Sequence, residues 1–179
     1  MKRILLMRHA KSSWDHPELG DKERPLNDRG NQAARDMGAW LPQQECHPDV
    51  ILHSTSARTT QTADLLCSHW GLPNCELDCQ AVDSLYLAPP QALLDTLGQL
   101  PANTETVLLI AHNPGLEELI AFIDRQYHRF PTAAVADIRY SDGPWDLALS
   151  DPRMFLNACR LAQVWRPKEI FDAAKRDAC

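Results

Sequence analysis

The sequence alternates short apolar runs with longer stretches in which apolar residues recur every three or four positions. The short runs are typical of buried strands, and the longer stretches are typical of amphipathic helices. We predict strands at 3–7, 49–53, 77–82, 106–111, 135–140 and 158–164. We predict helices at 31–41, 57–70, 91–100 and 114–123, with Pro42, Gly71 and Pro114 at their ends. This alternation favours a mostly parallel sheet that helices cover on both faces.

Two longer segments, 11–29 and 141–154, lack this periodicity. Irregular segments of this length in a compact domain are usually functional or mobile, and the first of them follows a predicted strand closely. The 179 residues are enough for one domain, which buries roughly 70% of the surface that its unfolded chain exposes. We therefore expect a single domain over residues 1–179, with a three-layer α/β/α fold whose core needs no disulfide or metal.

Charge and composition narrow the class of protein. The formal net charge of -6 and the thin spread of lysine and arginine argue against binding to nucleic acid or an anionic membrane. No apolar run approaches the roughly 20 residues of a membrane helix, and the run at 4–7 is too short for a signal peptide. We expect a cytoplasmic protein whose six cysteines are reduced and mostly serve in packing. The absence of a C-x-x-C pair disfavours a structural zinc site.

Cationic and imidazole side chains follow three of the predicted strands, close to the point where each strand ends. Arg8 and His9 follow the first strand, Ser54 and Arg58 follow the second, and His112 follows the apolar run TVLLIA. Ligands of an open parallel sheet bind beyond the carboxyl ends of its strands, so we expect these side chains to converge at one edge. Arginine grips phosphate through paired N–H donors, and nearby helix N-termini add oriented N–H groups. The set predicts an anion pocket.

Each member of this set also has a plainer interpretation. An Arg-His pair after a strand is common, Arg58 alone is compatible with a solvated helix residue, and His112 alone is compatible with a hydrogen-bonded histidine at a strand end. The occurrence of all of them at one predicted edge favours a functional site.

Three segments carry a resemblance to a known family. LMRHAKSSW, taken with RPLNDRG, resembles the opening of the histidine phosphatase superfamily, whose first motif is Arg-His-Gly; here Ala10 replaces the glycine. STSARTTQTA resembles the second block of that superfamily, and LLIAHNPG resembles the third. The short chain, the RHAK variant and the RPL-x-x-RG segment are most similar to the SixA-like phosphohistidine phosphatases. The resemblance covers residues 1 to about 125, and it implies a phosphoglycerate mutase-like fold.

The resemblance implies a role for each matching residue. His9 is similar to the nucleophile that becomes phosphorylated, and Arg8, Arg58 and His112 are similar to the residues that hold the phosphate. A neutral histidine keeps a lone pair on one ring nitrogen, and we expect a backbone carbonyl to accept a hydrogen bond from the other nitrogen. A cationic cradle stabilises the charge that spreads over the phosphoryl oxygens, so neither a metal nor a cofactor is implied.

Three further residues are candidates for the site. Asp83, in the segment DSLY, lies where larger family members carry a glutamate, so we predict that it is the proton donor; the alternative is a loop or capping aspartate. Arg24 is predicted to reach the pocket rim and bind substrate, with an ion pair to Asp21 or Glu23 as the alternative. Ser12 is predicted to bind substrate, or else it bonds the backbone of its own loop.

We therefore expect a phosphatase that forms a covalent phosphohistidine at His9. The favoured substrate is phosphohistidine in a protein partner, such as a phosphorelay domain, because the chain leaves little sequence for a lid over a small molecule. One alternative is a phosphomonoesterase that acts on a sugar phosphate or a nucleotide. Another is a catalytically weak, phosphate-binding regulatory module, which the intact cationic set argues against. A mutase is disfavoured because the chain is too short for the elements that reorient a bisphosphate.

Overall fold

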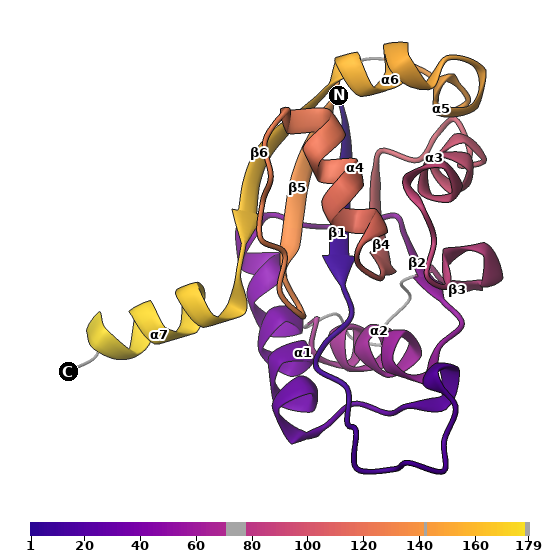
Figure 1. Ribbon diagram of the computed structural model, residues 1–179. Coiled ribbons are helices and arrows are strands. Elements are labelled where there is room, and N and C mark those ends of the chain that lie inside the picture. The colour runs from indigo at the N-terminus through magenta and orange to yellow at the C-terminus, as the bar shows by residue number, and fades with distance from the viewer. Residues whose placement is uncertain (71–77, 142, 178–179) are drawn as a thin grey trace.

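The computed structural model describes residues 1–70, 78–141 and 143–177, with side chains described as far as residue 172. Gly71 and the first residue of the strand predicted at 77–82 lie outside the described residues. One six-stranded sheet forms the centre of the molecule, in the order β3-β2-β4-β1-β5-β6 (Figure 1). Its strands are β1 (Lys2–Arg8), β2 (Val50–Ser54), β3 (Asp78–Val82), β4 (Thr106–Ala111), β5 (Val135–Tyr140) and β6 (Cys159–Trp165).

The sheet is parallel over four of its strands. β3, β2, β4 and β1 pair in parallel, whereas β5 pairs with β1 and with β6 in antiparallel orientation. The parallel strands β1, β2 and β4 read as continuous apolar runs because both of their faces are covered by helices. All six predicted strands are present, and the mostly parallel α/β sheet is confirmed, with an antiparallel edge that the sequence pattern does not reveal.

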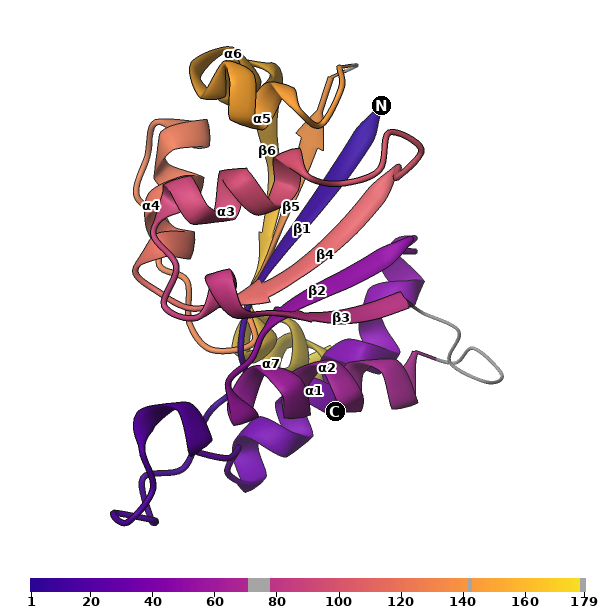
Figure 2. The same cartoon turned by 90° about the vertical axis from the view of Figure 1, so that its right-hand side faces the viewer.

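Helices cover both faces of the sheet (Figure 2). On one face lie α1 (Asp28–Trp40) and α2 (Ala57–His69), and on the other lie α3 (Pro90–Gly98) and α4 (Gly115–Asp124). Three helices follow later in the chain, α5 (Leu147–Ser150), α6 (Pro152–Ala158) and α7 (Pro167–Asp177). Short 3-10 turns occur at η1 (Asp21–Glu23), η2 (Leu41–Gln44) and η3 (Asp83–Leu85). The segment 141–154, predicted as irregular, therefore holds α5 and the start of α6.

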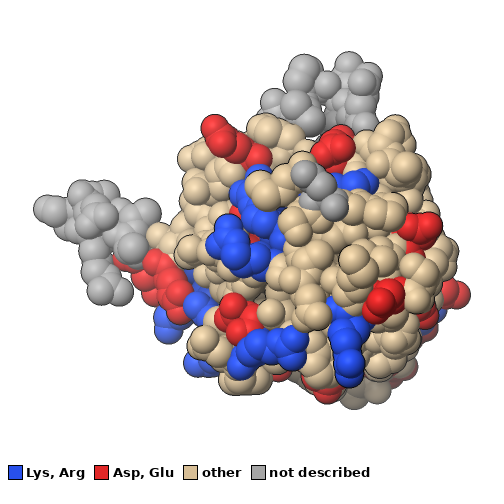
Figure 3. Space-filling model, turned by 90° about the horizontal axis from the view of Figure 1, so that it is seen from above, with Lys and Arg blue, Asp and Glu red and all other residues tan. Residues whose placement is uncertain are grey.

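Charged side chains are mixed on the face of the molecule at which β1 begins. Figure 3 views this face and shows acidic and basic residues interspersed among uncharged ones. This view shows no continuous basic surface of the kind that nucleic acids bind. Among the residues that the structure describes, no helix is long and apolar enough to cross a membrane.

The parallel register brings the ends of three strands together. Arg8 at the end of β1 pairs with Ala111 at the end of β4, and His53 near the end of β2 pairs with Ile110. The segment 11–29 lies beside this edge of the sheet (Figures 1 and 2). A Cβ on Gly30 would overlap the carbonyl oxygen of Lys11, so a glycine is required where this segment returns to α1.

Candidate active site

A cavity of about 360 Å³ opens at the carboxyl ends of β1, β2 and β4. The cationic set predicted from the strand ends surrounds it, together with Arg24 and Ser12, which are predicted to bind substrate. Its lining comprises Arg8, His9, Lys11, Ser12, Trp14, Asp21, Arg24, Arg58, Leu87, His112, Asn113 and Thr132. Segments distant in sequence therefore meet as the topology predicts, and Asp83 is the one predicted site residue outside this lining.

The His9 ring makes a hydrogen bond through Nδ1, and its Nε2 is available to a ligand in the cavity. Its Nδ1–H donates to the carbonyl oxygen of Ala10 at 2.7 Å, which confirms the expected backbone contact. The Ala10 amide in turn donates to Thr62 Oγ1 of α2 at 3.1 Å. Burial, together with the nearby His112 and arginines, lowers the pKa of His9 to about 3. His9 is therefore neutral at physiological pH, with the lone pair on Nε2.

Arg8 presents a buried donor with no acceptor among the described residues. Its Nη1 donates to the carbonyl oxygen of Phe130 at 3.0 Å, while its Nε is buried without a hydrogen-bond partner. Asn113 reaches the same carbonyl oxygen through Nδ2 at 3.0 Å, and its Oδ1 is likewise buried and unpartnered. Burial lowers the pKa of Arg8, but the group remains cationic. An unpaired guanidinium donor beside the cavity is suited to an anionic ligand.

Arg58 is held by a carboxylate from the 11–29 segment. This guanidinium, in a residue only 3% exposed, donates to the backbone oxygen of Asp21 and, through Nη2, to Asp21 Oδ2 at 2.8 Å. Arg24 Nη1 and the Tyr86 hydroxyl donate to the same carboxylate at 2.9 Å and 2.7 Å. Although burial acts to raise it, the pKa of Asp21 is lowered to about 2 by these three donors. Asp21 is therefore ionised at neutral pH and already occupies part of the cationic cradle.

His112 completes the cradle from the end of β4. Its Nε2 is 2.7 Å from Ser54 Oγ, and its Nδ1 accepts a long hydrogen bond of 3.4 Å from Arg58 Nη2. Burial and the charge on Arg58 lower the pKa of His112 to about 4. The ring centroids of His9 and His112 are 5.0 Å apart. Two neutral imidazoles and two arginines therefore face one small volume.

Two of the three residues for which the sequence left alternatives, Arg24 and Ser12, line the cavity. Arg24 lines the cavity and also forms an ion pair with Asp21, so its position agrees with both of the alternatives. It also donates to Ser12 Oγ at 2.8 Å and lies 3.2 Å above the Trp14 ring. The Ser12 hydroxyl thus accepts a hydrogen bond from Arg24 rather than bonding the backbone of its own loop.

Asp83 lies on the exposed surface beside the site. Its carboxylate accepts from Thr55 Oγ1 and pairs with Lys22 Nζ at 3.0 Å, and its side chain is 81% exposed. The hydrogen bonds from Thr55 and Lys22 lower its pKa. The role of Asp83 as proton donor stays a prediction. The carboxylate that does line the cavity is Asp21, which the sequence suggested only as a partner of Arg24.

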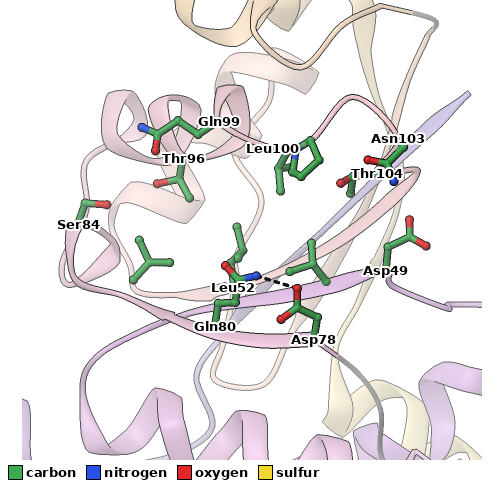
Figure 4. Close-up of a pocket in the computed structure, with 13 residues that line it drawn as sticks. Asp49, Leu52, Asp78, Gln80, Ser84, Thr96, Gln99, Leu100, Asn103 and Thr104 are labelled. Atoms are coloured by element: carbon green, nitrogen blue, oxygen red, sulfur yellow. Dashed lines mark hydrogen bonds between the residues drawn. The ribbon is translucent and has the colours of Figure 1, made fainter.

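A second and larger cavity, of about 410 Å³, lies away from the histidines. It is bounded by β2, β3 and α3 with the segment that follows α3, and Figure 4 shows its lining. Asp49 there accepts two backbone N–H groups, and Asp78 accepts from Gln80 at 2.7 Å. The described residues that line it include no histidine, lysine or arginine. The smaller cavity is therefore the candidate for phosphate chemistry.

Comparison with known proteins agrees with this geometry. A sequence model of the histidine phosphatase superfamily (branch 1) matches residues 4–80, which include His9 and Arg58. A solved structure assigned as the phosphohistidine phosphatase SixA of Agrobacterium tumefaciens is 25% identical to this chain, with a TM-score of 0.75. The match covers 93% of this chain and 98% of that one. A SixA structure from Nakamurella multipartitia gives the same identity and TM-score, covering 93% of this chain and 96% of its own. Over residues 4–80 the chain is thus similar to the histidine phosphatase superfamily, and its fold is similar to that of SixA phosphohistidine phosphatases.

Sequence relatives extend over most of the chain. The uncharacterized protein Rv1276c of Mycobacterium tuberculosis is 29% identical over 150 residues, which is 78% of this chain and 89% of that protein. The uncharacterized phosphatase PhoE of Bacillus subtilis is 23% identical over 179 residues, 81% of this chain and 92% of its own. The match to this superfamily and the SixA-like fold support a phosphatase activity.

Proposed function

We propose that this phosphatase removes the phosphoryl group from phosphohistidine in a protein partner, through a covalent intermediate on His9. The observation that carries the proposal is the neutral His9 ring, whose Nδ1–H is bonded to Ala10 and whose Nε2 is left for the cavity. Arg8 and Arg58 supply the positive charge that a phosphoryl transfer requires.

The first step forms a bond between His9 Nε2 and phosphorus while the bond from phosphorus to the substrate imidazole breaks. Charge spreads over the three equatorial oxygens of the phosphoryl group, and the guanidinium donors of Arg8 and Arg58 stabilise it. The bond from His9 Nδ1–H to the carbonyl of Ala10 persists in the phosphorylated ring. Water then attacks phosphorus, inorganic phosphate leaves, and His9 regains its lone pair.

The ionisation of the nearby carboxylates supports this choice of substrate class. Asp21 has a pKa of about 2 and the pKa of Asp83 is also lowered, so both are ionised at neutral pH before substrate binds. An alkoxide leaving group needs a proton, whereas the imidazole of phosphohistidine is a better leaving group. The site is therefore better prepared to break a P–N bond than a P–O bond.

The surface around the cavity favours a protein as the substrate. Trp14 and Leu87 both line the cavity, and they are 73% and 52% exposed. Exposed apolar side chains around a charged centre are typical of protein interaction sites. A SixA protein of the same fold, described as a protein histidine phosphatase, has been solved with tungstate, an oxyanion with the tetrahedral shape of phosphate.

A small-molecule phosphomonoesterase is the second candidate, and the position of Asp21 favours it. A phosphate dianion that takes over Arg58 would leave Asp21 beside a negative charge, which raises the pKa of a carboxylate. Asp21 would then be able to carry a proton to an ester oxygen. In this candidate, Asp21 is the acid and the substrate is a phosphate ester.

The decisive comparison measures kcat/KM for a phosphohistidine peptide and for phosphoramidate against a panel of sugar-phosphate, nucleotide and phosphoamino-acid esters. His9→Ala is the control for contaminating phosphatase. We expect the P–N substrates to be preferred over every ester. A strong preference for one ester would establish the second candidate, and tungstate binding without turnover of any substrate would establish a regulatory module.

A further inference from the structure

A second group of chemically reactive side chains lies on the α2 face of the sheet, outside the cavity lining. His53 is on β2, Cys79 is on the edge strand β3, and Cys67 is near the end of α2. Cys79 pairs in register with Ile51, and residues two apart share one face of a strand, so His53 and Cys79 point to the same side. Ile51 and Cys67 belong to the apolar cluster that α2 covers. Helix and strands therefore direct these three side chains towards one another.

The three side chains contact one another through hydrogen bonds. The Cys79 thiol is bonded both to the Cys67 thiol and to the His53 ring. His53 uses Nδ1 to donate to the backbone oxygen of Ser54 at 2.9 Å, which leaves Nε2 for Cys79. Cys79 is exposed on the edge strand, and Cys67 is half-buried. A small oxidant can thus reach Cys79 from solvent, while a second sulfur stands beside it.

The charges in this group favour a thiolate at Cys79. Hydrogen bonds from Cys67 and His53 lower the pKa of Cys79 to about 5, although burial and Asp64 act in the opposite direction. Burial acts to lower the pKa of His53, but its bonds to Cys79 and Ser54 and the charge of Asp64 raise it. An imidazolium next to a thiolate is the usual setting of a reactive cysteine.

Two other cysteines provide an internal contrast. Cys46 and Cys159 are buried in the two apolar clusters, and burial raises the pKa of these thiols to about 11 and about 12. Buried, protonated thiols are inert towards electrophiles and oxidants. The chain therefore carries thiols of opposite reactivity in one molecule.

We propose that Cys79 and Cys67 form a peroxide-sensitive dithiol, in which Cys79 is the attacking sulfur and Cys67 the resolving sulfur. The oxidant is hydrogen peroxide. The Cys79 thiolate attacks one peroxide oxygen, the O–O bond breaks, and the sulfur is oxidised to a sulfenic acid. The leaving hydroxide takes a proton from the His53 imidazolium and departs as water.

In the second step, the Cys67 sulfur attacks the sulfenic sulfur of Cys79. The S–O bond breaks, the hydroxyl leaves with the proton of the Cys67 thiol, and a disulfide remains. Two thiols and one peroxide thus give one disulfide and two waters. The product links the end of α2 covalently to the edge strand of the sheet.

Peptide mapping of the intact chain tests the proposal directly. The reduced protein is treated with hydrogen peroxide at pH 7, its remaining thiols are alkylated in denaturant, and its peptides are analysed by mass spectrometry. We expect a disulfide-linked peptide pair containing Cys67 and Cys79, with Cys46 and Cys159 recovered as alkylated thiols. Oxidation of Cys46 or Cys159 at the same rate as Cys79, or a disulfide that joins Cys79 to another cysteine only, would overturn the proposal.

Two variants separate the roles of the three residues. In Cys67→Ser, the expected product is a sulfenic acid on Cys79, captured by a dimedone reagent, with no intramolecular disulfide. The pH dependence of iodoacetamide alkylation tests the charge state of Cys79. Its alkylation rate should change less than about twofold between pH 6 and 8, whereas an ordinary thiol gains roughly tenfold per pH unit below its pKa.

His53→Gln should restore the steep pH dependence of alkylation at Cys79 while leaving the profile of Cys46 unchanged. A steep profile already present in the wild-type chain would contradict the thiolate assignment. An unchanged flat profile in His53→Gln would remove His53 from the site.

Discussion

The carboxylate of Asp21 competes with phosphate for Arg58, and removing its charge is expected to tighten oxyanion binding. Asp21 accepts hydrogen bonds from Arg58, Arg24 and Tyr86, and its pKa of about 2 measures how strongly they hold it. Lowering the pKa of a carboxylate from about 4 to about 2 corresponds to about 2–3 kcal/mol of interaction. The Asp21 side chain is 46% exposed, so water screens these contacts and about 1 kcal/mol is the realistic figure.

Asp21→Asn keeps the shape of the side chain and removes its charge. If phosphate must displace this carboxylate, the inhibition constants of tungstate and inorganic phosphate should fall about fivefold, the equivalent of about 1 kcal/mol. The assay is competitive inhibition with a chromogenic phosphate ester or phosphoramidate. Asp15→Asn is the matched control, because Asp15 lies in the same segment and bonds Ser13 rather than an arginine. Equal inhibition constants in Asp21→Asn and Asp15→Asn, or weaker binding in Asp21→Asn, would refute the competition.

Asp21→Asn should also change the free energy of unfolding. A carboxylate whose pKa is lower in the folded chain stabilises the fold above its unfolded pKa of about 4, and this stabilisation is lost as the pH falls through about 2. At pH 7, Asp21→Asn should therefore lower the free energy of unfolding by about 1 kcal/mol.

Three further predictions concern the other residues of the site. Arg58→Ala should raise KM for phosphorylated substrates at least tenfold and also lower kcat in steady-state assays; an unchanged KM would exclude Arg58 from the cradle. If Asp83 is the proton donor, Asp83→Asn should lower kcat for P–O esters more than kcat for P–N substrates; kcat values within about twofold of the unsubstituted chain for both substrates would remove Asp83 from the mechanism, in line with its exposure and its position outside the cavity lining. His9 and His112 are buried with pKa values of about 3 and about 4, so the unfolded chain binds more protons than the folded chain below about pH 6.5. Urea denaturation should show the free energy of unfolding falling from pH 7 to pH 4, by up to about 1.4 kcal/mol per pH unit for each histidine, and His9→Gln should reduce that slope.

The site residues that directly follow the predicted strands could be predicted from the sequence. Arg8, His9 and His112 adjoin apolar runs whose parallel pairing is itself a consequence of the alternation with helices. Once those runs are strands of one sheet, their carboxyl ends must lie at one edge, whatever the details of the side chains.

The contribution of the 11–29 segment could not be predicted in the same way. Asp21 meets Arg58 across 37 positions of sequence, through a segment with no hydrophobic periodicity to fix its path. Asp83 occupies the place along the chain that the family resemblance assigns to the proton donor, but its side chain pairs with Lys22 and is exposed to solvent. Sequence position predicts which segment approaches a site, but the direction of a side chain depends on tertiary contacts.

The same limit explains the differences in the fold. α5 and α6 are 4 and 7 residues long, too short to show a helical repeat. The antiparallel orientation of β5 and β6 depends on how the chain returns to the sheet edge, and the strand sequences alone do not encode it.

The central claim is that His9 carries the phosphoryl group, and rapid quenching tests it most directly. The enzyme is mixed with a labelled phosphoramidate or phosphohistidine peptide, quenched in alkali within the first turnover, and digested for mass spectrometry. Phosphohistidine should appear on the peptide that contains His9 and form at least as fast as phosphate is released, and the label should be absent in His9→Ala. A label on another residue, or full turnover by His9→Ala, would contradict the account.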